Sequence, residues 1–209
     1  MRNRLIVIVL LLVAAIPVNA AGERLEVRIV NSAREQIGKT LRYDVGYRVL
    51  TYPNGDVPID AGVCTDVVVR AFRSALGMDL QKLVHEDMVG HFACYPKLWG
   101  LRRPDRNIDH RRVPNLQTYF ERKGYRVRNS GDTKAYRPGD LVTCIVPPNL
   151  PHIMIISDKS SAKGIPLVIH NIGSGTREED RLFEFRHTGH YRVQEIQPEL
   201  QHGARDRVR

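Results

Sequence analysis

The chain has 209 residues, and its 32 lysines and arginines outnumber 23 aspartates and glutamates, which gives a formal net charge of +9. This length suits a domain with its own hydrophobic core, so a small fold that depends on disulfides is excluded. The basic charge favours anionic partners, but the basic residues are scattered and no nucleic-acid-binding motif is present. We therefore expect no nucleic-acid partner.

The first twenty residues have the features of a secretory signal peptide. Two arginines precede an apolar run over residues 5–16, and small residues lie before a cleavage position after Ala20. An uncleaved membrane anchor is the alternative, but Pro17 and Asn19 interrupt the run, which is shorter than the roughly 20 apolar residues of a membrane span. We predict a signal peptide over residues 1–20 and a periplasmic or secreted protein without a stable membrane span after cleavage.

The next part of the chain predicts helices, because its apolar residues recur at the spacing of a buried helical face. The predicted helices cover residues 29–37, 64–76, 80–92 and 114–123. Two long polar loops separate them, over residues 43–60 and 97–114, and loops of that length are often functional. The second loop holds the single tryptophan, Trp99, and is either a solvated surface loop or one wall of a binding site.

The second half of the chain predicts strands, because turn-forming residues alternate with short apolar runs. The predicted strands cover residues 141–146, 152–157, 165–170, 182–185 and 190–193. Helices followed by an antiparallel sheet define an α+β fold. We predict one domain over residues 21–197 and a flexible basic tail over residues 198–209, and we expect a monomer without a cofactor.

Cys64 begins the second predicted helix, where free backbone N–H groups and the helix dipole favour a thiolate. A thiolate is a nucleophile, although a lone cysteine is more often a small buried apolar residue. A nucleophile needs a base, and His152 begins one predicted strand while His170 ends the next. If these strands pair as a hairpin, His152 can face the sulfur while His170 or Asn171 holds its other nitrogen.

The remaining cysteines and histidines suggest no metal chemistry. A disulfide between Cys94 and Cys144 is open from sequence, and it would leave Cys64 as the free thiol of an odd set of three. His85 and His91 lie six residues apart, whereas a zinc-peptidase helix of the H-E-x-x-H type places its histidines four apart. We therefore predict no metal site.

Several segments resemble known families. Residues 137–142, Arg-Pro-Gly-Asp-Leu-Val, followed by His152 and an apolar strand, resemble the signature of NlpC-type, papain-like cell-wall cysteine peptidases. Residues 33–39 resemble the opening helix of those enzymes, and Tyr52 precedes Cys64 by twelve residues, as their tyrosine does. Over nearly all of the chain after the leader, the sequence more closely resembles a bacterial family known as domain of unknown function 1287. The segments that carry this closer resemblance are residues 62–68, 84–88, 107–116 and 170–173.

The resemblance implies a papain-like, NlpC-type fold, with N-terminal helices packed on a C-terminal antiparallel sheet. It implies Cys64 as the nucleophile, His152 as the base and His170 as the residue that orients the base. The residues assigned to oxyanion or substrate binding are Tyr52, Asp66, Asp109, His110 and Asn171. Of these, Asp109 and His110 either pair with the neighbouring arginines or line the cleft.

Three positions depart from the pattern of the peptidases. Val63 stands where the residue before the nucleophile is usually Asp, Thr65 stands for Ser, and Met154 stands for a small Gly in the base strand. These departures leave the cleft shape and the substrate choice open.

The predicted function is that of an exported cysteine hydrolase. It would cleave an amide bond in peptidoglycan stem peptides through a thioester intermediate, and transfer to another amine would use the same residues. The alternative is a non-catalytic cell-wall-binding module that retains a papain-like cleft. In both cases the expected partner is peptidoglycan or its peptides.

Overall fold

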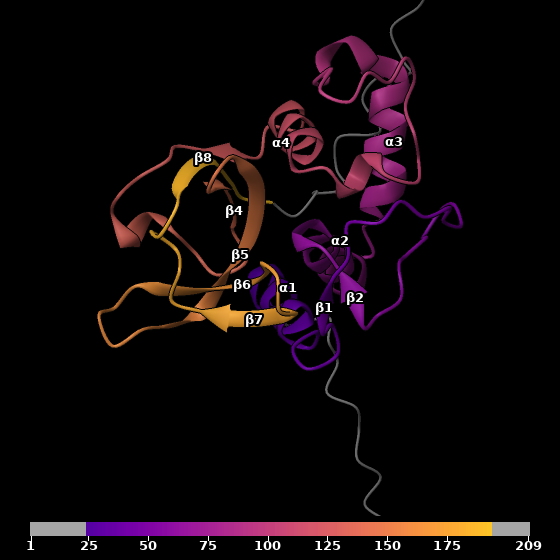
Figure 1. Ribbon diagram of the computed structural model, residues 1–209. Helices are drawn as coiled ribbons and strands as arrows, with labels where there is room; N and C mark the ends of the chain where they lie inside the picture. The colour runs from indigo at the N-terminus through magenta and orange to yellow at the C-terminus, as the bar shows by residue number, and fades with distance from the viewer. Residues whose placement is uncertain (1–23, 194–209) are drawn as a thin grey trace, which may run out of the picture.

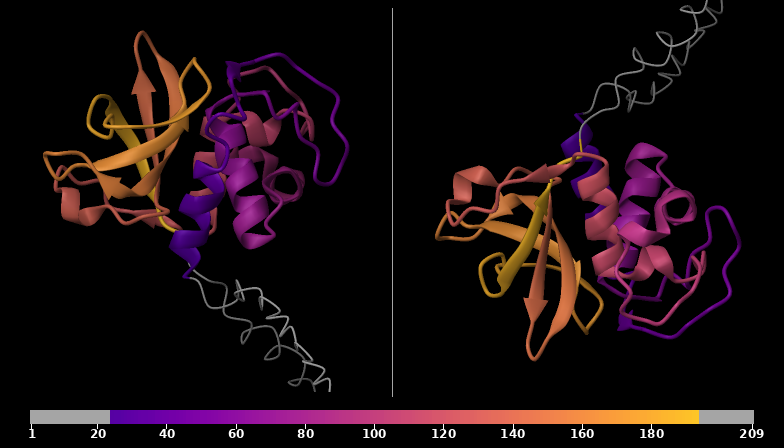
Figure 2. Two further views of the ribbon diagram at one scale, coloured as in Figure 1. Left: turned by 90° about the horizontal axis from the view of Figure 1, so that it is seen from below. Right: turned by 90° about the horizontal axis from the view of Figure 1, so that it is seen from above.

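The computed structural model describes residues 24–193. The N-terminal half forms helices that lie together beside a curved sheet made by the C-terminal half, as Figures 1 and 2 show. The predicted α+β class is therefore confirmed. The predicted leader, residues 1–20, and the predicted tail, residues 198–209, lie outside the described residues. Within the described part, no helix is long and apolar enough to cross a bilayer.

The α-helices of the described chain are α1 (Leu25–Arg34), α2 (Cys64–Leu76), α3 (Leu80–His91) and α4 (Val113–Arg122). Short 3-10 helices are η2 (Phe92–Cys94), η3 (Asp109–Arg111) and η4 (Thr133–Ala135). Helix α2 is the central one, since the other elements bury ten of its 13 residues. It ends at Gly77 with φ of 66°, a left-handed conformation that glycine adopts without a steric penalty.

Six strands form one antiparallel sheet in the order β3-β8-β4-β5-β6-β7. They are β3 (Arg126–Val127), β4 (Leu141–Val146), β5 (Leu150–Ser160), β6 (Pro166–Asn171), β7 (Thr176–Glu179) and β8 (Arg186–Tyr191). Residues 182–185, predicted as a strand, form a turn instead, and β7 precedes them at the sheet edge. A parallel pair of two-residue strands, β1 (Arg42–Tyr43) and β2 (Ala61–Gly62), closes the long loop between α1 and α2.

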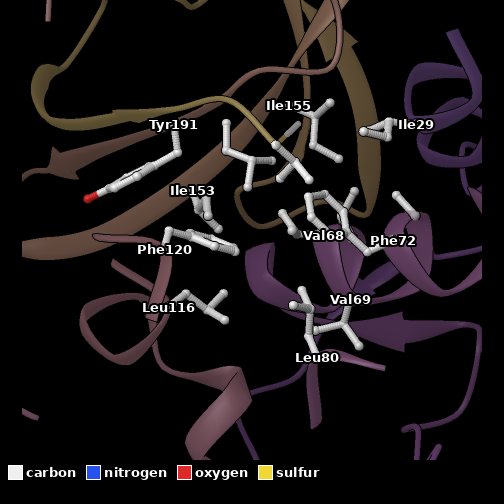
Figure 3. Close-up of a cluster of buried hydrophobic side chains, with 14 of the residues drawn as sticks. Ile29, Val68, Val69, Phe72, Leu80, Leu116, Phe120, Ile153, Ile155 and Tyr191 are labelled. Atoms are coloured by element: carbon white, nitrogen blue, oxygen red, sulfur yellow. The ribbon is translucent and has the colours of Figure 1, made fainter. Parts of the chain in front are cut away.

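Strand β5 divides the core, because successive side chains of a strand point to opposite faces. Ile153 and Ile155 pack among the helices, and Figure 3 shows them in one cluster with Phe72 of α2 and Phe120 of α4. Met154 and Ile156 belong to a second cluster on the opposite face of the sheet. Both faces of β5 are therefore buried, which fixes the register of the strand that carries His152.

A buried ion pair between Asp66 and Arg111 fixes the start of α2. Oδ2 of Asp66 accepts a hydrogen bond from the Val63 amide at 2.7 Å, which caps the helix. Nε and Nη2 of Arg111 donate to the two carboxylate oxygens of Asp66 at 2.9 and 3.0 Å. Arg111 also donates to the backbone carbonyls of Asp44 and Gly46, so the pair joins α2, η3 and the loop after β1.

We expect Asp66→Ala to lower the free energy of unfolding by about 3–5 kcal/mol, because it leaves the charge of Arg111 buried without its partner. Asp60→Ala is the matched control, since it breaks an exposed ion pair with Arg42 and should cost less than about 1 kcal/mol. Urea denaturation followed by circular dichroism measures both losses. Equal losses in the two variants would contradict the structural role of Asp66.

Candidate active site

Cys64 is the first residue of α2, and it borders a cleft of about 480 Å³. The opposite wall comes from the segment that begins at Trp99 and ends at Pro114, so this loop forms part of the cleft. Tyr43 of β1 and Pro151, which directly precedes His152, border the same cleft. The cleft therefore lies where the helices meet the start of β5.

Three hydrogen-bond donors beside the sulfur stabilise the thiolate form of Cys64. They are the backbone amide of Ile153, the hydroxyl of Tyr43 and the backbone amide of Thr65, and each lowers the pKa of the thiol. Because Ile153 directly follows His152, the sulfur lies beside the backbone of the strand that carries the predicted base. The meeting of an early helix and a late strand, expected from the sequence, is present.

Burial outweighs these donors. The Cys64 side chain is only 3% exposed, and desolvation raises the pKa of its thiol to about 11, with a smaller contribution from the negative charge of Asp66. The expectation that the helix start favours a thiolate is therefore wrong for this state. Desolvation, together with the charges of His170 and Arg181, lowers the pKa of His152 to about 3. At neutral pH the resting state holds a thiol and a neutral imidazole.

The structure brings His152 and His170 together on adjacent strands. Nε2 of His152 lies 2.8 Å from Nδ1 of His170, and Nε2 of His170 lies 3.2 Å from Oε2 of Glu179. All three side chains are carried by consecutive strands of the sheet, β5, β6 and β7. The third group that holds His152 is thus His170 and not Asn171, and Glu179 extends the chain.

This chain of hydrogen bonds fixes the tautomer of each histidine. A carboxylate only accepts, so His170 carries its proton on Nε2 and donates it to Glu179. Nδ1 of neutral His170 then accepts from Nε2–H of His152. The lone pair of His152 is left on Nδ1, outside the hydrogen bond to His170. That nitrogen is the one available as a base.

The imidazole of His152 and the sulfur of Cys64 are not directly bonded. Across the β4–β5 pair His152 lies opposite Cys144, so its side chain leaves the strand on the face opposite to Ile153. Among the described residues, no hydrogen bond joins His152 to Cys64. The two groups flank the same point of β5, and proton transfer requires the imidazole to turn toward the sulfur.

Tyr52 does not lie at the sulfur. Its ring packs edge-on against His85, with the centroids 5.4 Å apart, and the guanidinium of Arg106 lies 5.4 Å from it. The hydroxyl beside the sulfur belongs to Tyr43, and it also lies near the Cys64 backbone amide. The sequence spacing predicts Tyr52 at this place. Tyr43 lies there instead, because β1, which contains Tyr43, pairs with β2 just before Cys64.

Three further candidates are buried and do not border the cleft. The carboxylate of Asp66 binds Arg111 and caps α2, so it is not free to bind substrate. Asp109 is 1% exposed and accepts from the Asp105 amide, and burial raises its pKa to about 6. His110 is 2% exposed and does not border the cleft, and burial lowers its pKa to about 4.

Asn171 also has a structural contact rather than an open one. Its amide group donates to the carbonyl oxygens of Gly62 at 3.0 Å and Arg42 at 3.2 Å. It therefore ties the end of β6 to β1 and β2, the pair that carries Tyr43. Asn171 positions the cleft without facing it.

The cysteines form no disulfide among the described residues. Cys94 is exposed, with its sulfur 3.8 Å from Arg122, and Cys144 is buried within the sheet. The disulfide left open by the sequence is therefore absent. His85 packs on Tyr52 and His91 contacts the backbone of Asp87, and no described group of three His, Cys, Asp or Glu side chains could hold a metal.

Comparison with known proteins supports the closer of the two resemblances. A family model described as "Domain of unknown function (DUF1287)" matches residues 30–193. The uncharacterized protein YijF of Escherichia coli (strain K12) is 56% identical over 164 residues, which cover 78% of this chain and 80% of that protein. Neither description names a reaction or a ligand.

The rate of alkylation of Cys64 by iodoacetamide should rise with pH up to about pH 10 without levelling off, because the thiol pKa is about 11. At neutral pH Cys64 should react more than tenfold slower than N-acetylcysteine amide, whose thiol pKa is near 8.5. Peptide-resolved mass spectrometry separates Cys64 from the exposed Cys94. A plateau at or below neutral pH would show a preformed thiolate–imidazolium pair and contradict the buried neutral state.

Proposed function

The chain belongs to the DUF1287 family, whose function is unknown, and we propose that it is an exported cysteine hydrolase of the papain-like, NlpC-type class. Its substrate would be an amide bond in peptidoglycan stem peptides. The observation that carries the proposal is the position of the Cys64 sulfur beside the backbone of β5 at Ile153, the residue after a histidine whose tautomer is fixed by His170 and Glu179. A protein that only binds its ligand would not need a chain of hydrogen bonds that fixes the tautomer of a histidine.

In the first half of the reaction Nδ1 of His152 takes the thiol proton while the sulfur of Cys64 attacks the amide carbon. The carbonyl oxygen becomes negative, and the Tyr43 hydroxyl and the Cys64 amide, which both lie at the sulfur, are the donors for it. When the C–N bond breaks, the imidazolium of His152 gives its proton to the leaving amine, and a thioester remains.

In the second half water attacks the thioester and His152 takes its proton. The C–S bond breaks, the carboxylic acid leaves, and the proton returns to the sulfur of Cys64. An amine in place of water would give a new amide by the same steps. Both halves use one base, so the tautomer fixed by Glu179 is needed in each.

The neutral resting pair is compatible with this cycle. Proton transfer between two neutral groups creates opposite charges, whose mutual attraction offsets part of the desolvation that keeps each group neutral at rest. The donors around the sulfur stabilise the thiolate. Burial lowers the pKa of His170, and hydrogen bonding to Glu179 offsets part of that lowering. Substrate in the cleft brings the electrophile for which this charge separation is useful.

The enclosed thiol also favours the second candidate, a non-catalytic wall-binding module. That module would use the cleft beside Trp99 and Tyr43 but would leave Cys64 inert. It would sediment with cell-wall sacculi and release nothing from them. Both candidates would therefore bind the cell wall, but only the hydrolase would release products from it.

Mass spectrometry of muropeptides tests the hydrolase directly. The wild-type protein should convert stem peptides to shorter products that have gained one water, and Cys64→Ala and His152→Ala should release none. Cys144→Ala is the matched control, since it removes the neighbouring buried thiol from the other face of the strand pair and should retain activity. Identical products from wild type and Cys64→Ala would remove the hydrolase proposal.

Glu179→Gln should lower kcat/KM about tenfold to hundredfold, because the amide no longer dictates the histidine tautomers. Losing the carboxylate also removes an interaction that raises the pKa of His170. The acidic limb of the pH–rate profile should therefore move to lower pH. A merely structural role of Glu179 would not move it.

Glu178→Gln is the matched control for this change. Glu178 is the next residue of β7 but points to the other face, where it binds Arg34 at 2.8 Å. Its variant should leave the acidic limb in place, when rates are measured per folded molecule. A shift of the same size in both variants would contradict the assignment of Glu179.

A further inference from the structure

Two adjacent arginines border the cleft and differ in how their donors are used. Arg111 is 7% exposed, and its Nε and both Nη groups donate to Asp66 and to the carbonyls of Asp44 and Gly46. Four of its five N–H donors are thereby used within the protein. Arg112 borders the same cleft, but its guanidinium makes no hydrogen bond to any described residue.

The guanidinium of Arg112 is held in place by Trp99, but no hydrogen bond to a described residue uses its N–H donors. It stacks over the ring of Trp99 at 4.1 Å, and its side chain is 17% exposed. Its nearest anion is Oδ1 of Asp109 at 3.6 Å, which is too long for a hydrogen bond. Desolvated polar groups are usually paired, so a partly buried fork of five N–H donors beside open space indicates a ligand that accepts.

The rest of the cleft lacks an acidic counterpart. None of the described residues that border it is an aspartate or glutamate, and its other members are aromatic or aliphatic apart from Cys64 and Arg111. Asp109, whose carboxylate lies 3.6 Å from the guanidinium of Arg112, is 1% exposed and does not border the cleft. A ligand in the cleft therefore meets a cationic site within an apolar wall.

We propose that Arg112 anchors a free carboxylate of the peptide substrate, held on the edge of a guanidinium that Trp99 keeps in place. The ligand class is a short peptide with a free carboxylate close to the amide that reaches Cys64. The anchoring of a substrate rests on the proposed function, whereas the carboxylate site itself does not. A bidentate carboxylate contact needs the planar fork of Arg, which Lys lacks.

Trp99 is the only tryptophan of the chain, so its fluorescence reports on this cleft alone. The probes are N-acetyl-L-alanyl-D-alanine and its C-terminal amide, which differ only in the carboxylate. They are titrated into Cys64→Ala, which cannot turn them over, and calorimetry checks the affinities. The acid should bind about tenfold tighter than the amide, as expected for hydrogen bonds to a charged group.

Variants at the anchor decide the assignment. In the Cys64→Ala background, Arg112→Gln should remove the difference between acid and amide, and Arg112→Lys should keep only part of it. Arg102→Gln removes the same charge from the exposed part of the loop and should keep the full difference. The acid and the amide are compared within one variant, so a change in folding affects both.

Equal binding of acid and amide by Cys64→Ala, or no detectable binding of either, overturns the anchor. The anchor is equally overturned if Arg112→Gln keeps the tenfold difference. These outcomes are separate from those of the hydrolase, which fails if muropeptides stay uncleaved. Cleavage without carboxylate preference would remove the anchor alone, and preference without cleavage would remove the hydrolase alone.

Discussion

The buried ion pair of Asp66 and Arg111 is the interaction on which the cleft depends. It joins the first turn of α2 to η3 and to the loop after β1, which are far apart in the sequence. A buried ion pair gains little net free energy over apolar packing, but either partner alone would be a costly buried charge. The ion pair therefore contributes to the choice of one conformation more than to net stability. It fixes the start of α2 at Cys64, and the loop that Arg111 binds keeps Tyr43 beside the sulfur.

The alternation of strand side chains distributes roles within the sheet. In β7, Glu179 pairs with Val168 and shares its face with His170, whereas Glu178 pairs with Ile169 and faces α1. In β5, His152 joins the face of Cys144 while Ile153 packs under the helices. Adjacent residues thus serve either the hydrogen-bond chain or the scaffold, and a register slip of one residue would exchange them.

Local patterns predicted much of this arrangement. Periodicity and turn residues gave the α+β class, the helix that begins at Cys64 and the strands that bring His152 and His170 together. They did not identify Tyr43 or Glu179, because the first depends on the β1–β2 pair and the second on a four-residue edge strand without apolar pattern. Polar residues beside the motif were assigned to substrate, but loops of this length need buried polar groups of their own, and Asp109 serves one.

The protonation state of the site is the part that sequence could least supply, because desolvation depends on everything packed around a group. At the start of α2 the helix dipole favours a thiolate, yet burial raises the pKa of the Cys64 thiol. The raised pKa has a chemical consequence, since oxidation and alkylation follow the thiolate fraction. Under the proposed mechanism, a thiol that ionises only when the imidazole takes its proton would be protected from oxidation and would react only with an electrophile that fits the cleft. Burial, which disfavours the thiolate, would thus also make the proposed nucleophile selective.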